Sequence, residues 1–220
     1  MKPWIEEIYK EGLSLRLALK NKLFEGTSEF QKVEIFESAQ HGRVLLNDGC
    51  FMLSERDERI YHEMMAHVPL FVHPSPKRVL IVGGGDGGTA REVLRHACVE
   101  RCVMVEIDAM VVDACRTHIP QTAGALADQR LELKIEDGVA YMKHSRETFD
   151  VILIDSTDPN GAAQPLFGPE FYADVAARLA PTGIVVARAK ACFTKAKCRP
   201  ACWRSPTVCL SSRRCSTSPT

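Results

Sequence analysis

The stretch VLIVGGGDGGTARE, residues 79–92, constrains the fold of this chain more than any other segment. Four apolar residues lead into glycines with the spacing G-x-G-x-x-G, at Gly83, Gly85 and Gly88. A helix-forming sequence follows, and an acid, Glu106, stands about twenty residues further on, as the dinucleotide fingerprint requires. A strand, a glycine turn, a helix and a later acid predict a nucleotide-binding βαβ unit, in which Glu106 would bind ribose hydroxyls.

Apolar runs and helical patterns alternate along the rest of residues 55–187. The expected strands are 78–82, 102–107, 131–135, 151–155 and 183–187. The expected helices lie near 89–96, 109–118, 138–144 and 169–179. Continuous apolar strands that alternate with helices are typical of a parallel sheet covered on both faces, which binds ligands at the carboxyl ends of its strands. We therefore predict a Rossmann-like α/β domain here.

Residues 1–54 show a different pattern, in which apolar and polar residues alternate. Short alternating runs at 31–38, 42–46 and 50–53 are separated by turns, the last of which is the NDG at 47–49. Asx-Gly between alternating runs is a strong hairpin signal. The pattern predicts a small antiparallel β domain before the α/β domain.

Local signals also predict helix ends. Ser54 precedes ERDERIYHEMMAHVPL and is expected to cap it, and Pro69 is expected to end that helix. Pro169, in FGPEFY, is expected in the first turn of a later helix.

Acidic residues follow the predicted strands of the parallel sheet. They are Asp86 in the glycine turn, Glu106 and Asp108 after the second strand, Asp137 after the third, and Asp155 in DSTDP after the fourth. Because carboxyl ends of parallel strands meet at one edge of a sheet, these carboxylates are expected to lie close together.

Asp86 limits the kind of nucleotide that this turn can hold. Two unit charges of the same sign at ~4 Å cost about 4 kcal/mol at an effective dielectric constant of 20, so a pyrophosphate is disfavoured. A nucleoside with a cationic remainder fits better, such as an S-adenosyl sulfonium or an amine. A Mg²⁺ or Ca²⁺ site is the less favoured alternative, because the sequence has no D-x-D-x-D-G loop.

Charge and hydropathy exclude several partners. The chain carries 28 basic and 28 acidic residues, which gives no global field for nucleic acid or an anionic membrane. No apolar run approaches the ~20 residues of a membrane-spanning helix, and the acidic N-terminus is unlike a signal peptide. We expect a cytoplasmic protein with neither nucleic acid nor membrane as a partner.

The last segment, residues 188–220, differs from everything before it. It is rich in cysteine, lacks histidine and C-x2-C pairs, and shows no periodicity, so a zinc site is disfavoured and disorder is expected. Back-translation with a one-base shift after Ala187 gives a sequence with a Ser-x-x-Gln capping pattern and an amphipathic run. The hypothesis is that this tail is aberrant, the product of a frameshift.

Several segments together resemble one family. They are GRVLLNDG, ERDERIYHEMMAHVPL, VLIVGGGDGGTAREVLRH, VMVEID, EDGVAYM and FDVILIDSTDPNGAAQPLFGPEFY, and they resemble the spermidine synthases, the polyamine aminopropyltransferases. The resemblance covers about residues 3–187. It implies an N-terminal β domain followed by a Rossmann-like domain, as the patterns predict.

The resemblance implies an activity. The family transfers an aminopropyl group from decarboxylated S-adenosylmethionine to putrescine, which yields spermidine and 5′-methylthioadenosine. The nucleoside is then a co-substrate, so no cofactor and no metal are expected, and the protein would be a homodimer or homotetramer. Asp86 would repel the carboxylate of ordinary S-adenosylmethionine and attract the ammonium of the decarboxylated form.

The resemblance also assigns residues. The nucleoside would be bound by Gln31, Gly83, Gly85, Glu106, Asp137, Gly138 and Pro165. The amines would be bound by Tyr61, His62, Asp86, Asp155, Ser156, Thr157 and Asp158, with Asp155 as the catalytic proton acceptor. Without the resemblance, Tyr61 and His62 are better explained as core or interface residues of a helix, and Asp158 is equally well explained as the start of a turn.

Two other functions and the choice of acceptor stay open at this point. A methyltransferase on the same fold would need room for the donor carboxylate, against which Asp86 argues. A truncated homologue would bind a nucleoside without turnover. Cadaverine and spermidine differ from putrescine in length, and the sequence does not decide among these acceptors.

Overall fold

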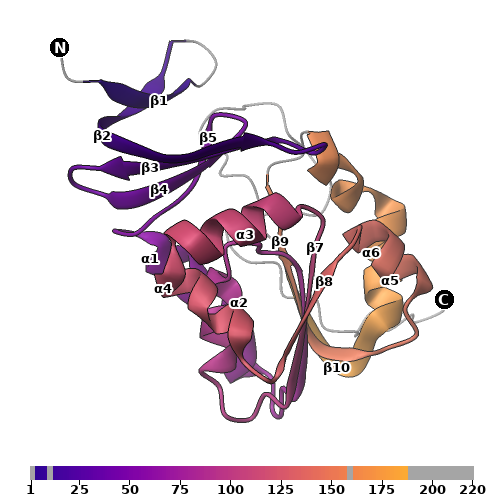
Figure 1. Cartoon of the computed structure of the whole chain (residues 1–220). Coiled ribbons are helices and arrows are strands. Elements are labelled where there is room, and N and C mark those ends of the chain that lie inside the picture. Colours follow the sequence, from indigo (N-terminus) through magenta and orange to yellow (C-terminus); the bar gives the residue numbers. More distant parts are fainter. Residues whose placement is uncertain (1–2, 9–11, 158–160, 188–220) are drawn as a thin grey trace.

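The computed structural model describes residues 3–8, 12–157 and 161–187. Two five-stranded sheets follow one another along the chain, and the smaller N-terminal sheet lies over one end of the larger α/β unit (Figure 1). The predictions made for Asp158 and for the tail at 188–220 fall outside the described residues. Within the described ranges, no helix is both long and apolar enough to cross a membrane.

The N-terminal sheet is antiparallel and its strands pair in chain order. Its strands are β1 (Trp4–Ile8), β2 (Ser14–Thr27), β3 (Lys32–Ser38), β4 (Gly42–Asn47) and β5 (Cys50–Ser54). The predicted turn joins β4 to β5, and its central residues have φ of 49° at Asp48 and 75° at Gly49, as a type I′ turn requires. The sequence pattern did not predict the hairpin formed by β1 and the long strand β2.

The second sheet is parallel, with the order β10-β9-β6-β7-β8. Its strands are β6 (Arg78–Gly83), β7 (Arg101–Glu106), β8 (Leu131–Ile135), β9 (Phe149–Asp155) and β10 (Leu179–Ala187). The chain runs outward from β6 to β8 and then returns to the other side of β6 with β9, so β6 and β9 flank the switch point where such sheets bind ligands. The predicted fold class is confirmed.

Helices cover both faces of this sheet (Figure 1). They are α1 (Glu58–Val72), α2 (Gly88–Leu94), α3 (Ala109–His118), α4 (Pro120–Ala123), α5 (Gly138–His144) and α6 (Pro169–Arg178), with the 3-10 turns η1 (Gly124–Ala127) and η2 (Gly161–Phe167). Alternate residues of β6 face opposite layers: Val79 and Ile81 pack with α1, α2 and α3, whereas Leu80 and Val82 pack with α5 and α6. Burial on both faces explains why these strands are continuously apolar.

Two predicted helix boundaries are wrong. Helix α1 begins at Glu58 after Asp57, and Ser54 does not cap it, because the Ser54 hydroxyl donates to the Asp57 carboxylate at 2.6 Å instead. Pro69 lies inside α1, which continues to Val72 and still has a hydrogen bond from the His73 N–H to the Pro69 carbonyl at 3.0 Å. Pro69 is buried in the core, so packing compensates for the lost backbone donor.

The remaining boundaries agree with the sequence more closely. Helix α6 begins at Pro169 as predicted. Strand β10 begins at Leu179 rather than at residue 183, because its pairing with β9 starts early and shifts register between Leu179 and Ile184.

Asp108 joins the two sheets. Its side chain is 1% exposed and caps α3 by accepting the Met110 N–H at 3.0 Å. The other carboxylate oxygen accepts from the Ser28 hydroxyl at 2.8 Å and from the Gln31 amide at 2.9 Å, both in the loop between β2 and β3. One buried carboxylate therefore fixes the N-terminal sheet against the α/β unit.

Replacing Asp108 should destabilise the protein strongly. Asp108→Ala removes a helix cap and takes the shared acceptor away from the partly buried side chains of Ser28 and Gln31, so we expect a loss of about 2–3 kcal/mol in the free energy of unfolding. Urea denaturation measures this loss. Asp113→Ala, on the same helix with a side chain 75% exposed, should change it by less than about 0.5 kcal/mol. Equal effects of the two substitutions would contradict the bridging role.

Candidate active site

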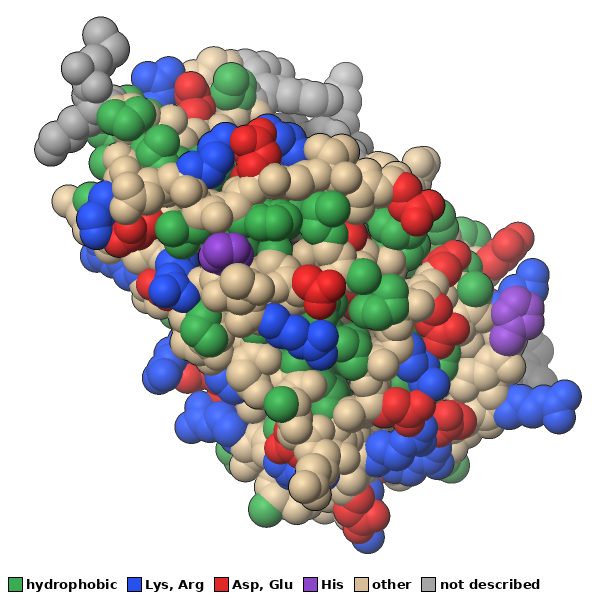
Figure 2. All heavy atoms as spheres, viewed as in Figure 1, with side chains coloured by type: hydrophobic (Ala, Val, Ile, Leu, Met, Phe, Trp, Pro, Cys, Tyr) green, Lys and Arg blue, Asp and Glu red, His purple; other side chains and the backbone are tan. Residues whose placement is uncertain are grey.

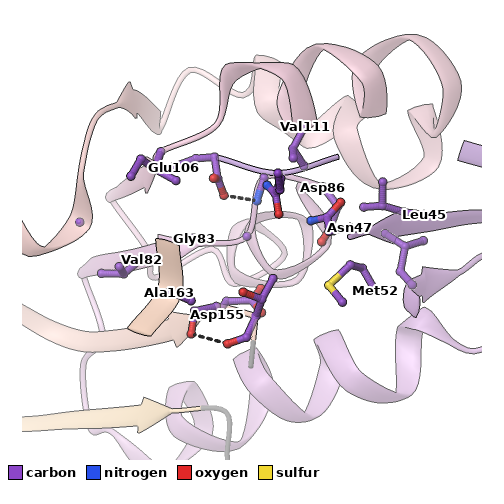
Figure 3. A pocket seen from close by; sticks show the side chains of 18 of the residues that line it. Leu45, Asn47, Met52, Val82, Gly83, Asp86, Glu106, Val111, Asp155 and Ala163 are labelled. Atoms are coloured by element: carbon purple, nitrogen blue, oxygen red, sulfur yellow. Dashed lines mark hydrogen bonds between the residues drawn. The ribbon is translucent and has the colours of Figure 1, made fainter. Parts of the chain in front are cut away.

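A cavity of about 550 Å³ lies where the N-terminal sheet meets the carboxyl ends of β6, β7 and β9 (Figure 3). Its walls come from the β2–β3 loop, β4 and β5, α1, the glycine turn, and the segments after β7, β8 and β9. The cavity therefore lies at the switch point of the sheet, where this fold places its ligands.

The glycine turn fixes one wall. Gly83 and Gly84 have φ of 86° and 76°, which L side chains rarely adopt, and the Gly84 N–H donates to the Asp155 carbonyl at 2.9 Å. A Cβ on Gly83 would clash with that carbonyl. Glycine is therefore required for the ends of β6 and β9 to approach this closely.

Glu106 lies at one end of the cavity, at the end of β7. It is 8% exposed and accepts the N–H of Gly85 at 3.0 Å (Figure 3) and the N–H of Asp108 at 2.9 Å. Burial raises the pKa of this carboxyl to about 7, although the backbone donors act in the opposite direction. A ligand that donates hydrogen bonds here would stabilise the ionised form.

Asp155, the last residue of β9, is held on both oxygens. The Tyr61 hydroxyl donates to one oxygen at 2.5 Å and the Thr89 hydroxyl to the other at 2.6 Å. Burial and then the negative charge of Asp86 raise the pKa of the Asp155 carboxyl, against the opposing effect of His62. A carboxylate with a raised pKa is a better proton acceptor than an ordinary one.

His62 links the carboxylates of Glu58 and Asp86. It is 2% exposed, with Nδ1 at 2.6 Å from Glu58 and Nε2 at 3.4 Å from Asp86. Burial lowers the pKa of His62, but the charge of Asp86 and the hydrogen bonds to Asp86 and Glu58 outweigh it and raise the pKa to about 10. The imidazole is therefore protonated at neutral pH, and both of its nitrogens are engaged.

Arg91 holds the Glu58 carboxylate in place. Its guanidinium binds both oxygens of Glu58, each at 2.8 Å. Burial raises the pKa of Glu58, but the hydrogen bonds from His62 and Arg91 dominate and lower it to about 2. The Asp86 carboxylate also accepts the Gly88 N–H at 2.7 Å at the start of α2, so its position is fixed from two sides.

The lining is strongly acidic. Six carboxylates line the cavity, on Asp57, Glu58, Asp86, Glu106, Asp137 and Asp155. Among the described lining residues there is no lysine or arginine, and His62 is the cationic side chain. Such a cavity favours a ligand that brings positive charge. Across the described parts of the chain, no group of three or more His, Cys, Asp and Glu side chains is placed to hold a metal ion.

Most residues expected at the site line this cavity. They are Gln31, Tyr61, His62, Gly83, Gly85, Asp86, Glu106, Asp137, Gly138, Asp155, Ser156 and Thr157. Asp137 also caps α5 by accepting the Val139 N–H at 2.8 Å. Pro165 lies in η2 beside the lining residues Ala163 and Leu166 but is not part of the lining itself, and Asp158 is outside the described residues.

Other residues that shape the cavity were not predicted from the sequence. Glu58 stands one helical turn before His62, a spacing that predicts contact, and Thr89 directly follows the glycine turn. Asn47 and Met52 come from β4 and β5 and gave no signal, because their position depends on how the two sheets meet.

Comparison with known proteins identifies the family. Residues 3–55 match the spermidine synthase tetramerisation domain, and residues 58–202 match the spermine/spermidine synthase domain. The chain belongs to the spermidine synthase family.

Curated relatives of this spermidine synthase family member carry the name polyamine aminopropyltransferase. This chain is 43% identical over 188 residues to a polyamine aminopropyltransferase of Bacillus mycoides, and the match covers 86% of this chain and 68% of that protein. It is 47% identical over 182 residues to one of Halorhodospira halophila, covering 82% and 66%. The chain thus spans about two thirds of the length of these relatives.

Two solved structures are similar to this spermidine synthase family member. One is a spermidine synthase in complex with the transition-state analogue AdoDATO, with a TM-score of 0.82 and 43% identity, covering 84% of this chain and 64% of that one. The other is the spermidine synthase of Thermotoga maritima, with a TM-score of 0.81 and 40% identity, covering 87% and 64%.

The charge on His62 predicts how stability depends on pH. Its pKa is about 10 in the folded protein against an ordinary 6.5, so its contribution is complete below pH 6.5 and is lost as pH rises towards 10. His62→Gln should therefore cost several kcal/mol at pH 6 and less at pH 10. Urea denaturation at both pH values tests this, and the exposed His144→Gln should follow the wild-type profile. A cost independent of pH would contradict a protonated His62.

Proposed function

We propose that this protein transfers an aminopropyl group from decarboxylated S-adenosylmethionine to putrescine, giving spermidine and 5′-methylthioadenosine. The observation that carries the proposal is the acidic cavity itself, in which six carboxylates surround a nucleotide-binding turn without a lysine or arginine among the described lining residues. Donor and acceptor both bring ammonium groups, and the donor also brings a sulfonium. The names of the relatives, and the AdoDATO complex of one of them, support the same reaction.

The nucleoside would occupy the end of the cavity near Glu106. The Glu106 carboxylate would accept from the ribose hydroxyls and Asp137 from the adenine amino group. The absence of side chains on the glycines lets the ligand approach the backbone closely. The other residues proposed for this part are Gln31, Gly83, Gly85, Gly138 and Pro165.

Proton transfer to Asp155 would activate the acceptor. A protonated amine has no lone pair, so one ammonium of putrescine must first lose a proton, and the Asp155 carboxylate accepts it directly or through water. The freed nitrogen attacks the carbon next to sulfur, the C–N bond forms as the C–S bond breaks, and methylthioadenosine departs as a neutral thioether. No oxyanion forms, so alignment of nitrogen, carbon and sulfur would supply much of the rate.

The other polar residues would position the amines. Asp86 attracts the ammonium of the decarboxylated donor, and Tyr61, Ser156, Thr157 and Asp158 would contact the amines. His62 acts through Asp86 and Glu58, since both of its nitrogens are engaged. A methyltransferase would place the carboxylate of S-adenosylmethionine against Asp86, which makes that alternative less favourable.

We also propose an oligomeric state and a cellular location. The match to a tetramerisation domain supports a homo-oligomer, and we propose a homodimer or homotetramer in the cytoplasm, without a metal or other cofactor. Trp4, Ile8, Leu13 and Leu15 are between 46% and 77% exposed on the N-terminal sheet and would form its contact surface. The face seen in Figure 2 mixes acidic and basic side chains, which gives no support for nucleic acid or a membrane as partner.

The reaction can be tested on the purified protein by mass spectrometry. The mixture contains decarboxylated S-adenosylmethionine and equal amounts of putrescine, cadaverine and spermidine. Formation of methylthioadenosine together with a rise in spermidine above its starting amount, without aminopropylated cadaverine or spermidine, is the expected result, and it identifies putrescine as the acceptor. Methylthioadenosine binding without any product would instead support a nucleoside-binding homologue without turnover.

Asp155→Asn should separate chemistry from binding. The amide keeps the size of the side chain but accepts no proton, so kcat should fall by about 10²–10⁴-fold. Affinity for methylthioadenosine, measured by calorimetry, should stay within about twofold. Asp113→Asn, on the exposed side of α3, is the matched control and should leave kcat unchanged. A loss of kcat below about tenfold in Asp155→Asn would rule out Asp155 as the proton acceptor.

A further inference from the structure

Asn47 has an unmet hydrogen-bond acceptor at the cavity wall. It is the last residue of β4, is 8% exposed, and lines the cavity. Its Oδ1 is shielded from solvent and has no hydrogen-bond partner among the described residues. Buried polar atoms are nearly always paired, so this oxygen needs an explanation.

Asn47 is a polar residue beside apolar side chains of the same cavity wall. Leu45, two residues earlier on the same face of β4, and Met52 and Leu53 of β5 form the apolar part of this wall. An apolar side chain at position 47 would complete the wall without leaving a buried acceptor unpaired. The amide therefore lowers the stability of the free protein, which points to a use when a ligand is bound.

The position of Asn47 indicates which part of a ligand it would meet. Figure 3 shows it at the end of the cavity that holds Asp86 and Met52, away from Glu106 and Val82. Rotation about χ2 of an asparagine is broad and exchanges Oδ1 and Nδ2, so a cation in the cavity can draw the oxygen towards itself.

We propose that Asn47 is a specificity residue, whose Oδ1 accepts a hydrogen bond from the primary ammonium of the donor's aminopropyl group. This inference rests on the proposed function. An amide fits here better than another acid, because the cavity already has six carboxylates, and a seventh would add to the repulsion among them. Asn47 thus adds an acceptor for the ammonium without adding charge.

The test compares two ligands that differ in this group. Decarboxylated S-adenosylmethionine carries the aminopropyl ammonium, and methylthioadenosine lacks it. By calorimetry, Asn47→Leu should weaken binding of the first about tenfold or more, as expected for a hydrogen bond to a charged group, and change the second less than about twofold. The thermal midpoint of the unliganded variant should rise, whereas loss of a structural hydrogen bond would lower it.

Two further variants complete the design. Asn47→Asp keeps an oxygen acceptor at the same place and should retain affinity for the decarboxylated donor within about threefold, also if the leucine variant does not fold. Leu46→Met changes the neighbouring residue, which packs with the opposite core around Ile5 and Phe36, and should change neither affinity.

The outcomes separate this inference from the proposed function. If the wild-type protein binds neither ligand, the proposed function fails and the inference with it. If it binds both and Asn47→Leu weakens both equally or neither, only the inference is overturned. A rise in KM for putrescine with unchanged donor affinity overturns it as well, because Asn47 would then hold the acceptor.

Discussion

The close approach of the ends of β6 and β9 is the constraint on which the site depends. The Gly84 N–H donates to the Asp155 carbonyl at 2.9 Å, an approach that a side chain on Gly83 would block. This contact places the Asp155 carboxylate on one side of the glycine turn and leaves the Gly85 N–H free to hold Glu106 on the other. The carboxylates proposed as ribose ligand and proton acceptor are thus both positioned by one backbone turn, whose geometry requires glycine.

The negative charges of the acids in this cavity repel one another, and neighbouring cations offset some of them more than others. Glu58 is fully balanced, because Arg91 and protonated His62 bind it, and its pKa falls to about 2. Burial raises the pKa values of Glu106 and Asp155; the charge of His62 opposes this only in part at Asp155, and no cation among the described lining residues does so at Glu106. The ribose hydroxyls proposed for Glu106 would stabilise its ionised form through hydrogen bonds, whereas an ammonium of the substrate would compensate the charge of Asp155. Part of the energy that binds the amines would then come from a charge that the folded protein leaves incompletely compensated.

The sequence predicted the parts that depend on local pattern. Apolar runs located the strands of the parallel sheet, and the acids after them, Asp86, Glu106, Asp137 and Asp155, meet at one cavity because parallel strands share an edge. Pro69 was misjudged because core packing outweighed a local helix-ending signal. Asn47 could not be found in this way, since no pattern along the chain shows which face of the first sheet meets the second.

That meeting is set by Asp108, which holds Ser28 and Gln31 over the start of α3. The same contact brings the loop, β4 and β5 to the cavity, where Gln31, Asn47 and Met52 form the wall opposite the parallel sheet. The N-terminal sheet thus contributes residues that close the site, and its outer strand β1 carries the exposed Trp4 and Ile8 proposed for assembly. Because β1 to β5 form one hydrogen-bonded sheet, pairing of subunits at its outer edge would stiffen the wall that contains Asn47. Oligomerisation and donor recognition would then be coupled through a single small domain.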